Sequence, residues 1–103
     1  MITVGILELR ILNSICDDYE PFFIIEGEIL QYRDNKATKQ EIVKSLVVLI
    51  RHNYAECYND NFNKIRNLDN VKFDSGYANY FKITKKGMMV LNDKDVSEEI
   101  FNV

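Results

Sequence analysis

The stretch that decides the fold is residues 38–54, TKQEIVKSLVVLIRHNY. Its first four residues, Thr38-Lys39-Gln40-Glu41, match a capping box, in which a Thr hydroxyl and a Glu carboxylate satisfy the first backbone amides of a helix. Asn53 tolerates the left-handed conformation that closes many helices. The sequence therefore predicts a helix that begins after Thr38 and ends near residues 52–53. Its core-facing side is formed by apolar residues at helical spacing, namely Ile42, Leu46, Leu49 and Ile50.

Two helices are predicted upstream of this stretch. Apolar residues repeat every three or four positions over residues 3–17, and again over residues 23–33 after Pro21. A strand beginning at Ile2 is the alternative for the first segment. Gly27 in the second segment either lets another backbone approach or moves the start of the helix to about residue 26. Residues 34–37 read as a short polar turn.

Downstream of Asn53 the apolar residues no longer repeat every three or four positions. They occur at every second position, as they do in a strand. Residues 54–58 and 79–83 are rich in aromatic residues and predict two short strands, which pair most simply as an antiparallel hairpin. The connection, residues 59–78, is long for a loop, so we expect it to be functional or partly structured. Its apolar residues are expected to form a local packing cluster, namely Phe62, Ile65, Leu68, Val71 and Phe73.

The remaining signals are short. Asp74-Ser75-Gly76 indicates a turn, and Thr84 can cap a short helix that carries Met88, Met89 and Leu91. Residues 92–103 form an acidic tail that adds a helix or frays.

Length and composition exclude several classes. A chain of 103 residues, 47% apolar and 28% charged, is typical of one globular domain. We expect a core over about residues 4–91. No apolar run approaches the roughly 20 residues of a membrane-spanning helix, and the N-terminus does not resemble a secretory signal. Two cysteines and one histidine cannot supply a disulfide framework or a paired-ligand zinc site. The expectation is a cytoplasmic protein without membrane, metal or cofactor.

Charge is unevenly distributed along the chain. The net charge is −3, yet residues 36–91 hold ten Lys and Arg against five Asp and Glu, a net +5. The acidic residues concentrate in residues 1–35 and in the tail. A local basic surface matters more to a polyanion than the total charge does. The alternative is that these bases are the solvated faces of helices and strands.

The order helix, helix, turn, capped helix, strand, long loop, strand, short helix resembles that of winged helix-turn-helix transcriptional regulators of bacteria and archaea. Two segments carry the resemblance: residues 42–54 (IVKSLVVLIRHNY) are similar to their third helix, and residues 80–87 (YFKITKKG) to the end of their wing. It implies an α+β fold, mainly α, with three core helices, a small antiparallel hairpin and a C-terminal helix. Residues 38–53 would be the recognition helix and residues 59–78 the wing.

The resemblance also implies a DNA-binding surface. Gln40 and Lys39 are the candidates for reading base edges, with Lys44 beside them, because Gln pairs with adenine and Lys reaches guanine acceptors. Lys36 and Thr38 suit phosphate contacts at the start of the helix. The wing adds Lys64, Arg66 and Lys72.

Two functions from different classes follow. The first is a regulator that binds duplex DNA, as a homodimer formed through apolar residues of the tail, namely Ile100, Phe101 and Val103. The second is a protein–protein adaptor with the same fold, which the overall acidity and Glu41 favour.

An enzyme is not expected. His52 lies at a helix end, Cys57 has no flanking base that would activate it, and Cys16 is expected on or near the apolar face of the first helix. Most of the aromatic residues are expected on core faces, which is favoured over base stacking on single strands.

Overall fold

The computed structural model of the chain describes residues 4–73 and 76–93. They form an α+β fold in which four helices pack against a small antiparallel sheet. The tail residues Ile100, Phe101 and Val103 and most of the Asp74-Ser75-Gly76 turn lie outside the described residues. The elements in chain order are α1 (Ile6–Ser14), α2 (Phe22–Leu30), α3 (Lys39–Arg51), β1 (Ala55–Asn59), β2 (Lys64–Ile65), the 3₁₀ turn η1 (Leu68–Asn70), β3 (Asn79–Ile83) and α4 (Lys85–Leu91).

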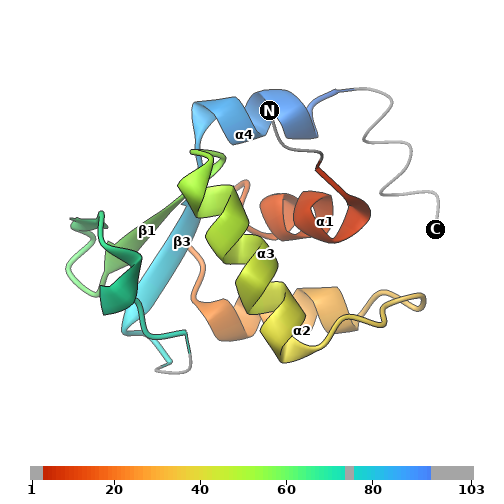
Figure 1. Cartoon of the computed structure of the whole chain (residues 1–103), viewed down its shortest axis with the longest axis horizontal. Helices are drawn as coiled ribbons and strands as arrows, with labels where there is room; N and C mark the ends of the chain where they lie inside the picture. The colour runs from red at the N-terminus through yellow and green to blue at the C-terminus, as the bar shows by residue number, and fades with distance from the viewer. Residues whose placement is uncertain (1–3, 74–75, 94–103) are drawn as a thin grey trace.

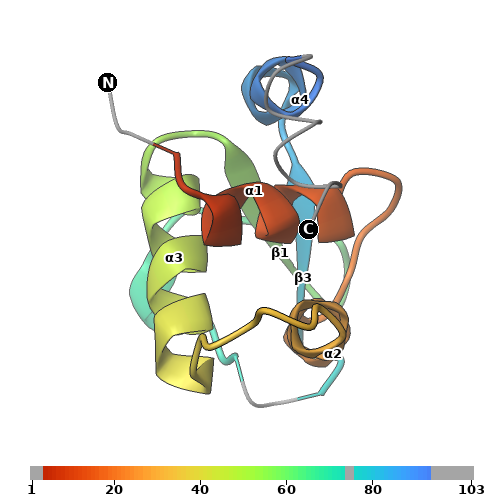
Figure 2. The same cartoon turned by 90° about the vertical axis from the view of Figure 1, so that its right-hand side faces the viewer.

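Helix α1 is the centre of the arrangement. It contacts α2, α3 and α4, and the sheet lies beside the helices with β1 against α3 and β3 against α2 (Figures 1 and 2). The buried side chains of these elements form one continuous core, which includes Ile11, Leu12, Ile25, Leu46 and Phe81. Among the described residues no helix is long and apolar enough to cross a bilayer.

The capped helix predicted from residues 38–54 is confirmed. The Thr38 hydroxyl accepts a hydrogen bond from the Glu41 amide at 3.2 Å, and the Glu41 carboxylate accepts one from the Thr38 amide at 3.2 Å. Asn53 ends the helix with a φ of +64°. Ile42, Leu46 and Leu49 are fully buried, whereas Ile50, also predicted to face the core, is half-buried.

The two predicted strands do pair antiparallel, with Cys57 opposite Phe81. The simple hairpin is extended by β2, which pairs with the other side of β1, so that the strand order is β2-β1-β3. The outer edge of β3 is also occupied, because Glu20 and Phe81 exchange two backbone hydrogen bonds of 2.9 and 2.8 Å. The long connection is therefore partly structured, as one of the two expectations had it.

The two upstream helices are shorter than predicted. α1 begins after Gly5 and leaves Cys16 beyond the helix, half-buried, and α2 ends at Leu30. Gly27 lies inside α2, is exposed, and has no other residue within 4 Å of the place where a Cβ would stand. Both explanations offered for this glycine are therefore wrong: no backbone approaches it, and the helix does not begin there.

The structure explains in physical terms why residue 87, at the end of the 80–87 segment, is a glycine. A Cβ at this position would overlap the carbonyl oxygen of Tyr54 and stand 2.8 Å from the Ile83 side chain. Thr84 completes the junction, since its hydroxyl donates to the Asn53 carbonyl at 2.6 Å and accepts from the Gly87 amide at 3.0 Å. The first turn of α4 is thereby packed onto the end of α3.

Candidate nucleic-acid interface

The face of α3 opposite its buried side chains is polar and open. At 3.6 residues per turn, Gln40 and Lys44 lie directly opposite the direction of Ile42, Leu46 and Leu49. Both are exposed, and so is Lys39 at the side of the same first turn. The structure thus leaves exposed the two residues predicted for base contacts, Gln40 and Lys39, and Lys44 beside them.

Arg51 belongs to the same face and was missed by the sequence analysis. It follows Lys44 by seven residues, which is two helical turns, and it is exposed. Lys86 of α4 stands near the same helix end: its Nζ donates to the His52 carbonyl at 3.2 Å and lies 4.8 Å from the centre of the Tyr54 ring. The spacing of Arg51 could have been found from the sequence, but the position of Lys86 could not, because it depends on how α4 packs.

The start of α3 is less favourable to an anion than its sequence suggests. The amide and the hydroxyl of Thr38 both donate to the same carboxylate oxygen of Glu41, at 3.2 and 3.1 Å. Lys36 is exposed but lines a hollow of about 320 Å³ together with Asp34 and Glu41. A phosphate at this helix end would therefore meet carboxylates as well as Lys36 and the helix dipole.

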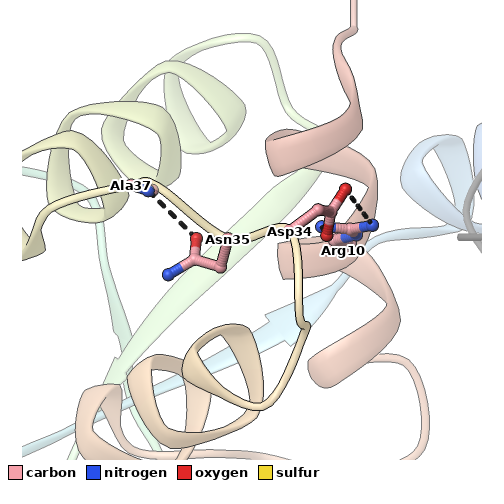
Figure 3. A network of polar contacts seen from close by, with 4 residues as sticks. All are labelled: Arg10, Asp34, Asn35 and Ala37. Atoms are coloured by element: carbon pink, nitrogen blue, oxygen red, sulfur yellow. Dashed lines mark hydrogen bonds and ion pairs between the residues drawn. The ribbon is translucent and has the colours of Figure 1, made fainter.

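A buried arginine positions the turn that precedes α3. Arg10 of α1 is only 5% exposed, and its Nη1 pairs with Asp34 at 2.8 Å while a second contact, Nη2 to Oδ2, measures 3.3 Å (Figure 3). The guanidinium also lies 3.8 Å from the centre of the Tyr32 ring. Asn35 tightens the next peptide by accepting a hydrogen bond from the Ala37 amide at 3.0 Å. The Arg10 guanidinium holds the pKa of the Asp34 carboxyl below its usual range.

The three predicted wing cations come together. Lys64, Arg66 and Lys72 are exposed and line one hollow of about 510 Å³ with several asparagine side chains. Asp60 is the acidic member of the lining. A cluster of cations and amides is suited to phosphate oxygens, which accept hydrogen bonds from both.

The wing hollow lies near the end of α3, not near its start. A second hollow of about 280 Å³ is lined by Ile50 and Asn53 on the α3 side and by Lys64 and Arg66 on the wing side. Because α3 has 13 residues, its two ends are separated by roughly 20 Å. The predicted residues therefore form two groups, one at the first turns of α3 and one in the wing, with Arg51 between them.

The remaining chemical candidates are the two thiols and His52. Burial raises the pKa of the Cys57 thiol to about 12, and burial also raises that of Cys16, so both thiols stay protonated and unreactive near neutral pH. His52 is exposed at the end of α3. No group of three His, Cys, Asp or Glu side chains that could hold a metal ion occurs within residues 4–73 and 76–93.

Comparisons of the chain with protein-family models, with curated proteins and with solved structures give no match.

Proposed function

We propose that this chain is a winged helix-turn-helix protein that binds duplex DNA and regulates transcription by occupying an operator. The helix α3 would enter the major groove, which is about 12 Å wide and accepts one helix. The observation that carries the proposal is the open polar face of α3, with Gln40, Lys44 and Arg51 exposed along it and the basic wing hollow beside its end.

The arrangement of elements supports the winged-helix assignment. Residues 31–38 join α2 to α3, the first wing strand follows α3 closely, and the segment before α2 pairs with the outer edge of β3. In this arrangement base readout comes from Gln40 and Lys39, and phosphate contacts come from Lys44, Arg51 and the wing cations.

The test is a fluorescence-anisotropy titration of a labelled duplex at two ionic strengths. We expect the affinity to fall as the salt concentration rises, and the slope of log K against log [salt] to be near −0.9 for each phosphate neutralised. The double variant Lys39→Ala, Lys44→Ala should bind more weakly and show a smaller slope. Lys82→Ala is the matched control, because this lysine lies on the outer face of the sheet, and it should leave the titration unchanged.

Two results would contradict the proposal. The first is an affinity that ignores both salt and the double substitution. The second is an equal loss in Lys82→Ala, since the binding surface would then not be α3. Gln40→Ala is expected to leave the salt slope unchanged while flattening the preference between duplex sequences by about 1–3 kcal/mol per affected base pair.

A protein–protein adaptor is the second candidate, and one observation favours it. The carboxylates of Asp34 and Glu41 lie at the start of α3 and interrupt the positive surface between Lys36 and Lys39. An adaptor would use the same α3 face for a protein partner, so it would show no salt-dependent affinity for any duplex.

A further inference from the structure

The aromatic residues were assigned to the core, and this is wrong for most of them. Among the described aromatic residues only Phe22, Tyr54 and Phe81 are buried. Six others form an unbroken path of ring contacts along the surface, with centroid distances of 4.9 to 6.4 Å. We call this path the aromatic surface; in order of contact its members are Tyr58, Tyr19, Phe62, Tyr80, Tyr77 and Phe23.

The aromatic surface covers the face of the sheet that is turned away from the helices. Along β1 and β3 the side chains alternate, so Cys57 and Phe81 point into the core while Tyr58 and Tyr80 point outward. The exposed fractions of Phe23, Phe62 and Tyr77 are 42%, 52% and 64%. This is a large exposed apolar area for so small a protein, and such areas mark interaction sites.

Phe62 is held in this surface by a strained turn. Its φ is +59°, a conformation that side chains other than Gly and Asn rarely adopt. The Asn59 side chain fixes the turn by accepting hydrogen bonds from the amides of Asn61 and Asn63, both at 2.9 Å. The ring is thereby placed between Tyr19 and Tyr80, although a glycine or an asparagine would fit the backbone better. A requirement for the ring itself explains why a phenylalanine stands there.

The surface suits a protein better than a nucleic acid or a small molecule. Three of its ring pairs are nearly perpendicular, at 71° to 88°, so that neighbouring rings cover each other's faces and leave few flat platforms for bases. Asp17 and Asp18 are exposed next to Tyr19 and would repel phosphates. None of the three hollows described above is lined by one of the six rings.

The charges at the two borders of the aromatic surface, on the β3 side and on the β2 side of the sheet, favour a second copy of this chain as the partner. On the β3 side the segment before α2 brings Asp17 and Asp18, while on the β2 side Lys64 and Arg66 are exposed. Between the borders, Glu56 accepts from the Tyr58 hydroxyl, contacts Lys64 at 3.5 Å and lies opposite Lys82, whose Nζ is 5.4 Å from the centre of the Tyr19 ring. Arg66 is therefore the basic border residue with no ion pair to a described residue inside the surface. A two-fold axis that lies between the two copies and runs along the strands places the acidic border of each copy against the basic border of the other.

From these observations we infer that the chain forms a symmetric homodimer through the aromatic surface. A standard interface takes about 800 Å² from each partner, which is of the order of one face of a molecule with extents of 36 × 26 × 22 Å. Aromatic residues are the side chains most enriched at the centre of such interfaces. The dimer leaves α3 uncovered, because α3 packs on the opposite side of the sheet, but it engages Lys64 and Arg66, so the dimer and the wing contacts with DNA compete for these two cations. This inference does not rest on DNA binding.

Sedimentation of the full chain over the micromolar range, without DNA, tests the inference. We expect a monomer–dimer equilibrium in the wild type and association at least about tenfold weaker in Phe62→Gly. Glycine adopts the φ of residue 62 without strain, and this gain offsets the lost ring contacts with Tyr19 and Tyr80, so the unfolding temperature of the Phe62→Gly monomer should change little. Leu30→Ser is the matched control, since this leucine is 60% exposed on α2 outside the surface, and its association should equal that of the wild type.

A charge exchange tests the symmetry. Arg66→Glu and Asp18→Lys should each weaken self-association, because each brings like charges together twice. An equimolar mixture of the two variants should dimerise again, because both contacts between unlike variants are attractive. A wild type that stays monomeric throughout, a Phe62→Gly variant that associates as strongly as the wild type, or a mixture that stays monomeric would each overturn the inference.

Discussion

The turn that leads into α3 and the wing that follows β1 are both irregular segments that carry candidate contacts, and different chemistry holds each of them. The turn is fixed from outside by a charge, through the pair between Arg10 of α1 and Asp34. The wing is fixed by neutral amides of its own: Asn59, Asn67 and Asn79 all accept hydrogen bonds from backbone amides within it. The position of the turn should therefore depend on pH, and the path of the wing should not.

The two segments are joined through α3. The largest loss in the free energy of unfolding is expected from a substitution of Gly87, where α4 packs on the end of α3. Gly87→Ala places a Cβ against the Tyr54 carbonyl, which cannot move without disturbing the end of α3. We expect a loss of about 3 kcal/mol or more in the free energy of unfolding, measured by urea denaturation.

Gly27→Ala is the control for that substitution. This helical position has open space around it, so alanine should raise the free energy of unfolding by about 0.5–1 kcal/mol. A similar loss in both variants would contradict the proposed overlap at Tyr54.

The wing is tested by Asn79→Ala. Asn79 is 5% exposed, its Oδ1 accepts from the Lys72 amide at 2.7 Å, and its Nδ2 donates to the Tyr58 carbonyl at 3.5 Å. Removing the amide leaves these groups without their partner and should cost about 1–2 kcal/mol. Hydrogen exchange should show lost protection at Lys72, with the turn at Asn35–Ala37 unchanged. A loss of protection in both places would show that the two segments are not held independently.

The turn is tested by pH, with the smallest expected effect because Asp34 is in contact with water. Its pKa is lowered in the folded protein, so the pair contributes stability above the ordinary Asp pKa of about 3.9 and loses it as the pH falls through the folded value. The difference in unfolding midpoint between the wild type and Asp34→Asn should shrink between about pH 6 and about pH 3.

Arg10→Met is the control for the pH experiment, because it removes the cause of the lowered pKa. In an Arg10→Met background the further change Asp34→Asn should have no pH-dependent effect. An unchanged pH dependence in that background would mean that another group, and not Arg10, responds to Asp34.

The candidate site could be predicted in part. All eight residues chosen from the sequence are exposed, because polar side chains in a turn, in the wing or opposite the apolar stripe of a helix face water. That the wing cations share a hollow could not be predicted, since it depends on β2 and on the asparagine contacts of the loop. The Glu41 carboxylate accepts a hydrogen bond from the Thr38 hydroxyl and so competes with a phosphate at the start of α3. This follows from the capping box itself and could have been anticipated.

What the sequence determined by itself is local. The capping box at Thr38, the left-handed Asn53 and the bounds of β3 depend on neighbours a few residues away, and the printed residues suffice for them. Only the tertiary structure decided which aromatic rings are buried, which lysine stands by Tyr54, and why residue 87 is glycine. The reason is physical: period and capping act within one element, whereas burial and close approach depend on segments that meet only after the chain has folded.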